Sequence, residues 1–229
     1  MKTTLTVFLV LFSVNAFCQC HPYFPIKEGV KYTYDFYNAK DKLASRSTNE
    51  FKRVSDTGGK VTATMQQQII DPKKGDILTT SESEWTCEGG VVRFSMDALN
   101  ISGADMSTTG MDVTVEGDEM DIPSELKPGQ TLNDVTYHIT MKLSGINVMD
   151  RNFFIKNRKV EKEESITTPA GTFNCIKISY TTESSGKSGD MSKPMLTSIW
   201  YSRDVGMVKV ENYKDDKVSN SQILTKLEK

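Results

Sequence analysis

Apolar and polar side chains alternate with a period of two residues along most of this 229-residue chain, and no other feature restricts its fold as much. The run of Val30, Tyr32, Tyr34 and Phe36, for example, alternates with Lys, Thr, Asp and Tyr residues. Successive side chains of a β-strand point to opposite faces, so this pattern predicts strands with one face against a core. Helical periodicity is almost absent. The chain is therefore predicted to be all-β.

Turn-forming segments separate the strands at short intervals, as is typical of an antiparallel meander. Gly58 and Gly59 form one such turn, because glycine adopts the positive φ that tight hairpins require. The predicted strands span residues 30–37, 43–54, 61–70, 77–87, 91–96, 111–115, 135–143, 152–166, 171–182, 196–202, 207–213 and 218–227. A meander of this kind predicts a rolled sheet or an open, barrel-like fold.

Three segments depart from the alternation. Residues 97–110 are rich in Gly, Ser, Thr and Asp, which indicates a flexible connection, with a short helix as the alternative. Residues 183–193 have the composition of a mobile hairpin loop. Residues 117–121 form an acidic stretch without the ligand spacing of a recognised calcium loop.

The two halves of the chain, about residues 26–97 and 111–229, resemble each other faintly. Each half contains a strand with a tryptophan, Trp85 or Trp200, that runs into a glycine turn and a second apolar strand. This similarity predicts two related half-repeats with the tryptophans in corresponding, partly buried places. A chance likeness between strand-turn-strand units is the alternative.

Residues 1–18 are predicted to form a signal-peptide helix rather than part of the fold. A positive start precedes the mainly apolar run Leu5–Val14, which is too short to span a bilayer as a helix. Cleavage after Ala16 or after Cys18 would release a single β domain, residues 19–229. The mature protein is therefore expected in the periplasm or outside the cell.

A lipoprotein signal, in which Cys18 or Cys20 would be lipidated, is the alternative. That processing favours a small residue directly before the cysteine, whereas Phe17 and Gln19 stand at these positions. Ordinary signal-peptide cleavage is therefore preferred. No later apolar run approaches the roughly 20 residues of a membrane helix, so no transmembrane segment is expected after signal removal.

Charge is almost balanced, with 28 basic and 30 acidic residues. Nucleic-acid binding requires clustered Lys and Arg, so the composition argues against a nucleic-acid partner. No cofactor is predicted either. The partner is left open as an apolar ligand or another envelope protein.

Three cysteines follow the predicted signal, so at least one is unpaired within a single chain. Cys175 lies within a strand pattern, which is typical of a small buried residue. Cys20 and Cys87 lie beside turn-like segments, and a disulfide between them would tie the N-terminus to the first half of the fold. An exported chain meets the oxidising conditions in which a disulfide persists.

Residues with catalytic chemistry are scarce, and no catalytic or metal site is predicted. Of the two histidines, His21 precedes a proline and His138 lies on the polar face of a predicted strand. Neither belongs to a nucleophile motif or a zinc-helix motif. Acidic residues are plentiful at 112–121 and 161–164. A glycan-acting hydrolase that uses two of them is the alternative function, because glycosidases need a facing carboxyl pair.

Two stretches are distinctive: Ile166–Ile178 (ITTPAGTFNCIKI) and Trp200–Lys209 (WYSRDVGMVK). Their TPAGTF-x-C hairpin and WY-x-x-x-VG-x-V strand pair resemble those of the TapB-like, domain-of-unknown-function family of exported bacterial proteins. Leu126–Gly129 (LKPG) fits the same pattern, and the resemblance covers most of the mature chain. It implies an all-β rolled or barrel-like sheet in the cell envelope and brings no catalytic residues.

The aromatic residues Tyr32, Tyr34, Phe36, Trp85 and Trp200 favour a noncatalytic envelope protein that binds an apolar or amphiphilic ligand, or a protein partner, on a concave sheet. The alternative is that these side chains simply form the core.

Overall fold

The computed structural model describes residues 20–94, 111–186 and 189–228, and all thirteen regular elements within them are β-strands. The all-β prediction is confirmed. No helix in these ranges is long and apolar enough to cross a membrane. The predicted signal peptide, residues 1–18, and the predicted connection, residues 97–110, lie outside the described residues.

The strands are β1 (Lys31–Asn38), β2 (Leu43–Thr57), β3 (Lys60–Ile70), β4 (Ile77–Glu88), β5 (Val91–Phe94), β6 (Met111–Gly117), β7 (Met120–Pro123), β8 (Val135–Leu143), β9 (Ile146–Thr168), β10 (Gly171–Ser185), β11 (Met195–Ser202), β12 (Gly206–Lys214) and β13 (Lys217–Glu228).

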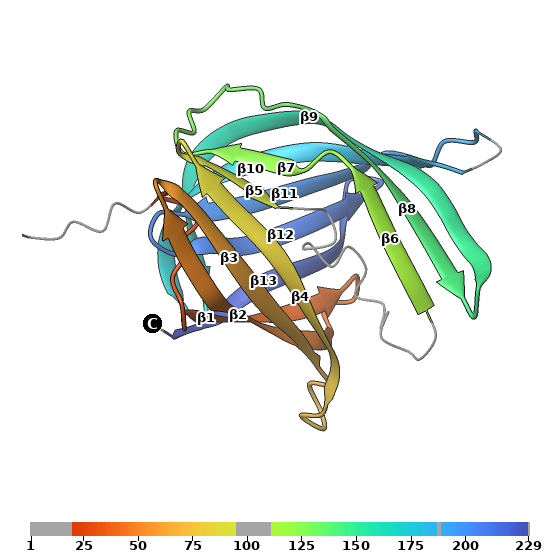
Figure 1. The fold of residues 1–229 in the computed structure, drawn as a ribbon, viewed down its shortest axis with the longest axis horizontal. Coiled ribbons are helices and arrows are strands. Elements are labelled where there is room, and N and C mark those ends of the chain that lie inside the picture. Colours follow the sequence, from red (N-terminus) through yellow and green to blue (C-terminus); the bar gives the residue numbers. More distant parts are fainter. Residues whose placement is uncertain (1–19, 95–110, 187–188, 229) are drawn as a thin grey trace, which may run out of the picture.

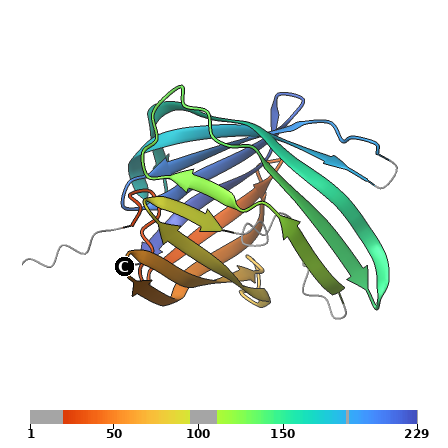
Figure 2. The same ribbon diagram turned by 45° about the horizontal axis from the view of Figure 1, so that its top comes forward.

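These strands form one antiparallel sheet in the order β6-β8-β9-β10-β11-β12-β13-β1-β2-β3-β4-β5-β7. The sheet curls so that one face is concave, as Figures 1 and 2 show. Its edge strands are β6 and β7, which are not hydrogen-bonded to each other. The predicted rolled sheet is therefore present, and it is unclosed.

The strand β7 was not predicted, because its four residues lie within and just after the acidic stretch 117–121. Only two residues, Asp118 and Glu119, link β6 to β7, although the two strands form opposite edges of the sheet. At Gly117 φ is +131°, and a Cβ there would lie 2.5 Å from the carbonyl oxygen of Thr136. Only glycine therefore fits where the chain passes from one edge to the other.

The buried guanidinium of Arg158 links β7, at one edge of the sheet, to β9 near the opposite edge. The Arg158 side chain on β9 donates from Nη1 to Asp121 Oδ1 (2.8 Å) and to the carbonyl of Asn133 (2.5 Å). Its Nη2 donates to the backbone carbonyl of Asp121 (2.5 Å). Because a buried charge is costly unless it is paired and hydrogen-bonded, these contacts are what allow Arg158 to lie inside the protein.

The core has two parts on opposite faces of the sheet. Ile176 and Ile178 on β10 belong to the main core on the concave side. Cys175 lies in a smaller cluster with Trp200 and Val208. Strand β10 is therefore apolar on both faces.

The prediction that the two tryptophans occupy corresponding places is wrong. Trp85 stacks on Phe94 in the main core, with 4.3 Å between ring centroids. Trp200 lies in the smaller cluster, and Tyr201 takes the core position on β11. A shift of one residue along a strand turns a side chain to the other face, which accounts for the difference. The proposed half-repeats, residues 26–97 and 111–229, and the single domain 19–229 stay predictions.

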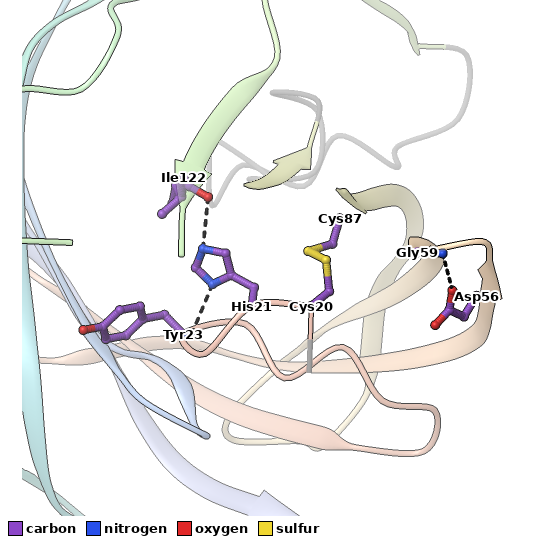
Figure 3. Close-up of a disulfide and its surroundings, with 7 residues drawn as sticks. All are labelled: Cys20, His21, Tyr23, Asp56, Gly59, Cys87 and Ile122. Carbon is purple, nitrogen blue, oxygen red and sulfur yellow. Dashed lines mark hydrogen bonds between the residues drawn. A yellow bond between two sulfur atoms is a disulfide. The ribbon is translucent and has the colours of Figure 1, made fainter. Parts of the chain in front are cut away.

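The N-terminal leader, residues 20–26, packs into the concave side at one end of the sheet (Figure 3). Phe24 contacts the rings of Trp85 and Tyr201, with centroids 5.8 and 5.0 Å away. A disulfide joins Cys20 to Cys87 on β4, the pairing that the sequence had left open. The leader is thus part of the core rather than a loose extension.

Replacing Arg158 with Met is expected to lower the free energy of unfolding by about 3–5 kcal/mol, because it leaves Asp121 Oδ1 and two backbone carbonyls without their donor. Urea denaturation measures the change. The control is Lys159→Met, which removes an exposed ion pair with Glu161 and should change stability by less than about 0.5 kcal/mol. Equal effects of the two substitutions would contradict the structural role of Arg158.

Replacing both Cys20 and Cys87 with Ser is expected to lower stability by about 4 kcal/mol, because the disulfide closes a 67-residue separation in the unfolded chain. The same denaturation assay, run with and without a reducing agent, measures it. The wild-type protein should lose stability on reduction while the double variant does not respond. A wild-type protein that is indifferent to reduction would argue against the bond.

Candidate binding surface at the open end of the sheet

The two ends of the rolled sheet differ in what they expose. The end that holds the leader and its disulfide is called the plugged end. The opposite end, called the open end, holds the β1–β2, β3–β4, β8–β9, β10–β11 and β12–β13 turns. All eleven exposed large hydrophobic residues among those described lie near the open end: Leu43, Ile77, Leu78, Val113, Leu143, Ile146, Val148, Met191, Met195, Leu196 and Val218.

The inner face of β8 shows how the core gives way to this surface. Ile139 is only 5% exposed, whereas Leu143, four residues further along the same strand, is 43% exposed. Its partner across the hairpin, Ile146, is 70% exposed. Val113 on β6 pairs with Met141 and widens the surface. The apolar face of the sheet therefore continues beyond the core into contact with solvent.

One cation lies on this apolar wall. Arg151 on β9 pairs with Ile139, so its side chain shares the inner face of β8 and β9. Its Nε is buried and has no hydrogen-bond partner in the part of the chain that the structure describes. Within the same part no carboxylate is paired with it. The Nε of Arg158 is buried without a partner in the same way, so this atom alone does not mark a ligand site. Arg151 as a whole is only half-buried, and an anionic group would meet its guanidinium through the terminal nitrogens.

Polar side chains line the concave face of the neighbouring strands toward the open end. The Thr197 hydroxyl donates to Asn212 Oδ1 (2.7 Å), and the Asn212 amide donates to Asn220 Oδ1 (2.6 Å). On β11 and β12, Thr197 and Asn212 are the next residues on the inner face after the core pair Ile199 and Val210, in the direction of the open end. Thr197, Asn212 and Asn220 are called the amide row. It connects three strands, β11 to β13, by side-chain hydrogen bonds.

A second polar pair lies on β2 and β3. Gln67 donates to Asn49 Oδ1 (3.2 Å), on the same face as the core residues Phe51 and Met65. The buried Ser47 hydroxyl nearby has no partner among the described residues. The concave side of the open end is thus apolar on β8 and β9 and amide-rich on β2, β3 and β11–β13.

The tyrosines of the inner face are neutral. Burial raises the pKa of Tyr180 to about 12 and raises the pKa values of Tyr32, Tyr137 and Tyr201 further. These rings therefore supply uncharged surface at physiological pH.

The aromatic residues predicted to bind a ligand do not form one surface. Tyr32, Tyr34 and Trp85 are buried in the main core, which agrees with the alternative that they are core residues. Phe36 is half-buried. Trp200 lies in the smaller cluster on the other face, where the ammonium groups of two lysines lie within 5.2 Å of its ring centroid.

His138 lies on the polar outer face of β8, as predicted. Its Nε2 lies 3.2 Å from Thr140 Oγ1 and 3.3 Å from Asp150 Oδ1, and its Nδ1 lies 3.0 Å from Asn152 Oδ1. A nucleophile–base–acid relay requires the hydroxyl and the carboxylate on opposite ring nitrogens. Here both lie on Nε2, so this constellation does not have the geometry of a triad.

His21 and Cys175 are both buried, and their contacts indicate structural roles. The His21 Nδ1 accepts the N–H of Tyr23 (3.2 Å), so Nε2 carries the proton and donates to the carbonyl of Ile122 (3.0 Å; Figure 3). Burial lowers the pKa of His21. Burial also raises the pKa of the Cys175 thiol to about 11, which keeps it protonated and unreactive at neutral pH.

Sequence reasoning missed Arg151 and the amide row. Arg151 was excluded because the strand was predicted to start at residue 152, whereas β9 begins at Ile146. Asn212 lies within a predicted strand, and its even spacing from Val210 was a usable signal for the inner face. The described residues contain no group of three or more His, Cys, Asp or Glu side chains suited to a metal ion.

A family model described as DUF3108-like matches residues 27–224. A crystal structure of a candidate exported protein with a YmcC-like fold from Bacteroides fragilis is 22% identical, with a TM-score of 0.75, and covers 92% of this chain and 100% of that chain. A crystal structure of a candidate lipoprotein from Parabacteroides distasonis is 23% identical, with a TM-score of 0.74, and covers 91% and 99%. These likenesses show the fold. No curated protein matches the chain.

The lowered pKa of His21 predicts a pH dependence of stability. Below the ordinary histidine pKa of about 6.5 the unfolded chain binds a proton that the folded chain excludes, so stability falls with decreasing pH down to the folded-state pKa. In this range the free energy of unfolding changes by at most about 1.4 kcal/mol per pH unit for one titrating group. Denaturation of the wild-type protein and His21→Gln between about pH 7.5 and 5 measures it.

The variant should show the flatter profile, because it lacks the titrating group. His138→Gln, on the outer face, should keep the contribution of His21 and serves as the matched control. Parallel profiles for the wild-type protein and His21→Gln would contradict the assignment.

Proposed function

This chain belongs to the DUF3108-like family, and from that premise we propose that it is an exported, noncatalytic envelope protein that binds a lipid-like ligand. The ligand lies on the concave side of the open end, with its apolar part against β8 and β9. An anionic head group lies at Arg151. The TapB-like resemblance of the sequence agrees with an envelope role and stays a prediction.

Arg151 is the observation on which this proposal rests. An apolar wall by itself fits any oily molecule. A guanidinium on that wall, without a carboxylate partner among the described residues, favours a ligand that joins a hydrocarbon part to a negative group. The amide groups of Asn212 and Asn220 supply further donors and acceptors on the same concave side. Ligand sites are commonly apolar with a few placed polar groups, and this surface has that composition.

Export is part of the proposal. The names of the two similar structures, a candidate exported protein and a candidate lipoprotein, support it together with the signal-like N-terminus. If the chain is a lipoprotein, Cys18 is the acceptor rather than Cys20, because the Cys20 sulfur is already bonded to Cys87. Otherwise cleavage after Ala16 or Cys18 releases the chain into the periplasm or the medium.

The hydrolase alternative has less support. A glycosidase needs a general acid whose pKa is raised. Hydrogen bonds from Trp200 and Lys162 lower the pKa of Glu164, one of the acidic residues that the alternative would use. Asp121, another of them, is bound to Arg158 and to the side-chain amide of Asn133.

Binding of a fluorescent long-chain fatty acid tests the proposal. Arg151→Met should weaken this binding roughly tenfold or more, because it removes a charge-assisted hydrogen bond to the carboxylate. Arg53→Met is the matched control, since Arg53 is an exposed residue paired with Glu82, and it should leave the affinity unchanged. The corresponding long-chain alcohol should bind the wild-type protein and Arg151→Met alike, because it has no charge.

Native mass spectrometry of protein gently extracted from cells provides an independent measurement. A species heavier than the bare chain is expected. Recovery of the bare mass alone, together with no saturable fatty-acid binding, would rule the proposal out. Equal losses of fatty-acid affinity in Arg151→Met and Arg53→Met would contradict the role of Arg151, although ligand binding itself would still be supported.

A further inference from the structure

The hairpins of the open end share a composition that ligand binding on the concave side does not require. In each of the five hairpins a lysine lies within three positions of an exposed large apolar residue. Lys142 directly precedes Leu143, for example, and Lys74 lies three positions before Ile77. The apolar residues at these tips include the most exposed in the described chain, Ile146 at 70% and Ile77 at 56%.

The charge of the tips differs in sign from that of the whole protein. The described tip residues include eight lysines and six aspartates, a net charge of +2, whereas the chain carries −2; the tips are residues 38–43, 70–77, 142–147, 189–195 and 214–218. The described tips are therefore slightly basic, whereas the whole chain is slightly acidic.

The aspartates of these tips also have a local structural role. Asp71 Oδ1 accepts the backbone N–H groups of Lys73 and Lys74, and Asp41, Asp215 and Asp216 adopt the positive φ of turn residues. The Lys73 and Lys74 ammonium groups form no ion pair with any carboxylate in the described ranges, and both side chains are exposed. They are thus available to an external anion.

We propose that the open end docks onto the surface of an anionic phospholipid bilayer. Several separate tips, each with at least one exposed apolar side chain and a nearby lysine, suit a soft interface where hydrocarbon lies just beneath negatively charged head groups. Apolar tip residues such as Ile146 enter the interface, and lysines such as Lys142 remain among the phosphates. A single protein groove would instead favour one continuous apolar patch.

The position of the chain ends is compatible with this orientation. The leader and the end of β13 both lie at the plugged end, away from the tips (Figures 1 and 2). Docking also brings the concave side, with Arg151, to the bilayer from which a lipid-like ligand would come. The hairpin tips contact the bilayer in this proposal, whereas the lipid-like ligand binds the concave side of β8 and β9. Docking is therefore tested separately from ligand binding.

Ile146→Trp provides a reporter at the most exposed tip. With vesicles of phosphatidylcholine containing about 30% phosphatidylglycerol, its fluorescence should shift to shorter wavelength and be quenched by brominated lipid chains. Sedimentation with these vesicles should show binding about tenfold tighter than with phosphatidylcholine alone, and the difference should shrink at high salt. The unsubstituted protein is the control for the signal of Trp85 and Trp200.

Ile77→Asp combined with Ile146→Asp should weaken vesicle binding roughly tenfold or more, because two apolar contacts are lost. Thr57→Asp combined with Thr62→Asp adds the same charge at exposed positions of the plugged end and should weaken it far less. Equal losses in the two double variants, or no response of Ile146→Trp to any vesicle, would overturn the inference. Fatty-acid binding that persists in the tip variant would show that the concave site works without docking.

Discussion

The buried guanidinium of Arg158 is the contact on which the shape of this protein depends. The chain passes from one edge of a thirteen-stranded sheet to the other within two residues, so β7 must be held without help from its neighbour in sequence. Arg158 does this by binding the carboxylate and the carbonyl of Asp121. The next residue, Ile122, then presents its carbonyl to His21 of the leader. The position of β7 thus sets the position of the leader, and the disulfide at Cys20 fixes the leader to β4.

Plugging one end of a rolled sheet leaves the other end to meet solvent. The leader supplies Tyr23 and Phe24 to the core at the plugged end, and the described residues there include no exposed large hydrophobic side chain. At the open end the sheet continues for several residues past the core, and Leu143 and Ile146 remain uncovered. Because exposed apolar surface of this extent is unusual unless it has a partner, the asymmetry is the strongest indication of where the protein acts.

The alternation of side chains predicted nearly all the strands, because each half-buried strand repeats the same period and turn residues separate them. It did not predict β7, whose four residues are too few to show a period. It also placed Trp200 by analogy with Trp85, although a shift of one residue reverses the face. Arg151 was missed for a related reason: a charged residue on an inner face breaks the pattern that identifies strands, so the strand was predicted to start after it. Local patterns therefore predict the scaffold better than the site, where side chains depart from them.

The exposed edge of β6 is a competing surface for partners, since an edge strand offers unpaired backbone groups to another chain. Glu116 lies on this strand, and charged residues on an edge strand disfavour pairing with a second sheet. The strand then ends at Gly117, where the chain turns away toward β7. The β6 edge therefore has features that protect against strand addition, whereas the hairpin tips have none that conceal their apolar side chains. This contrast favours contact through the tips over assembly through the edge.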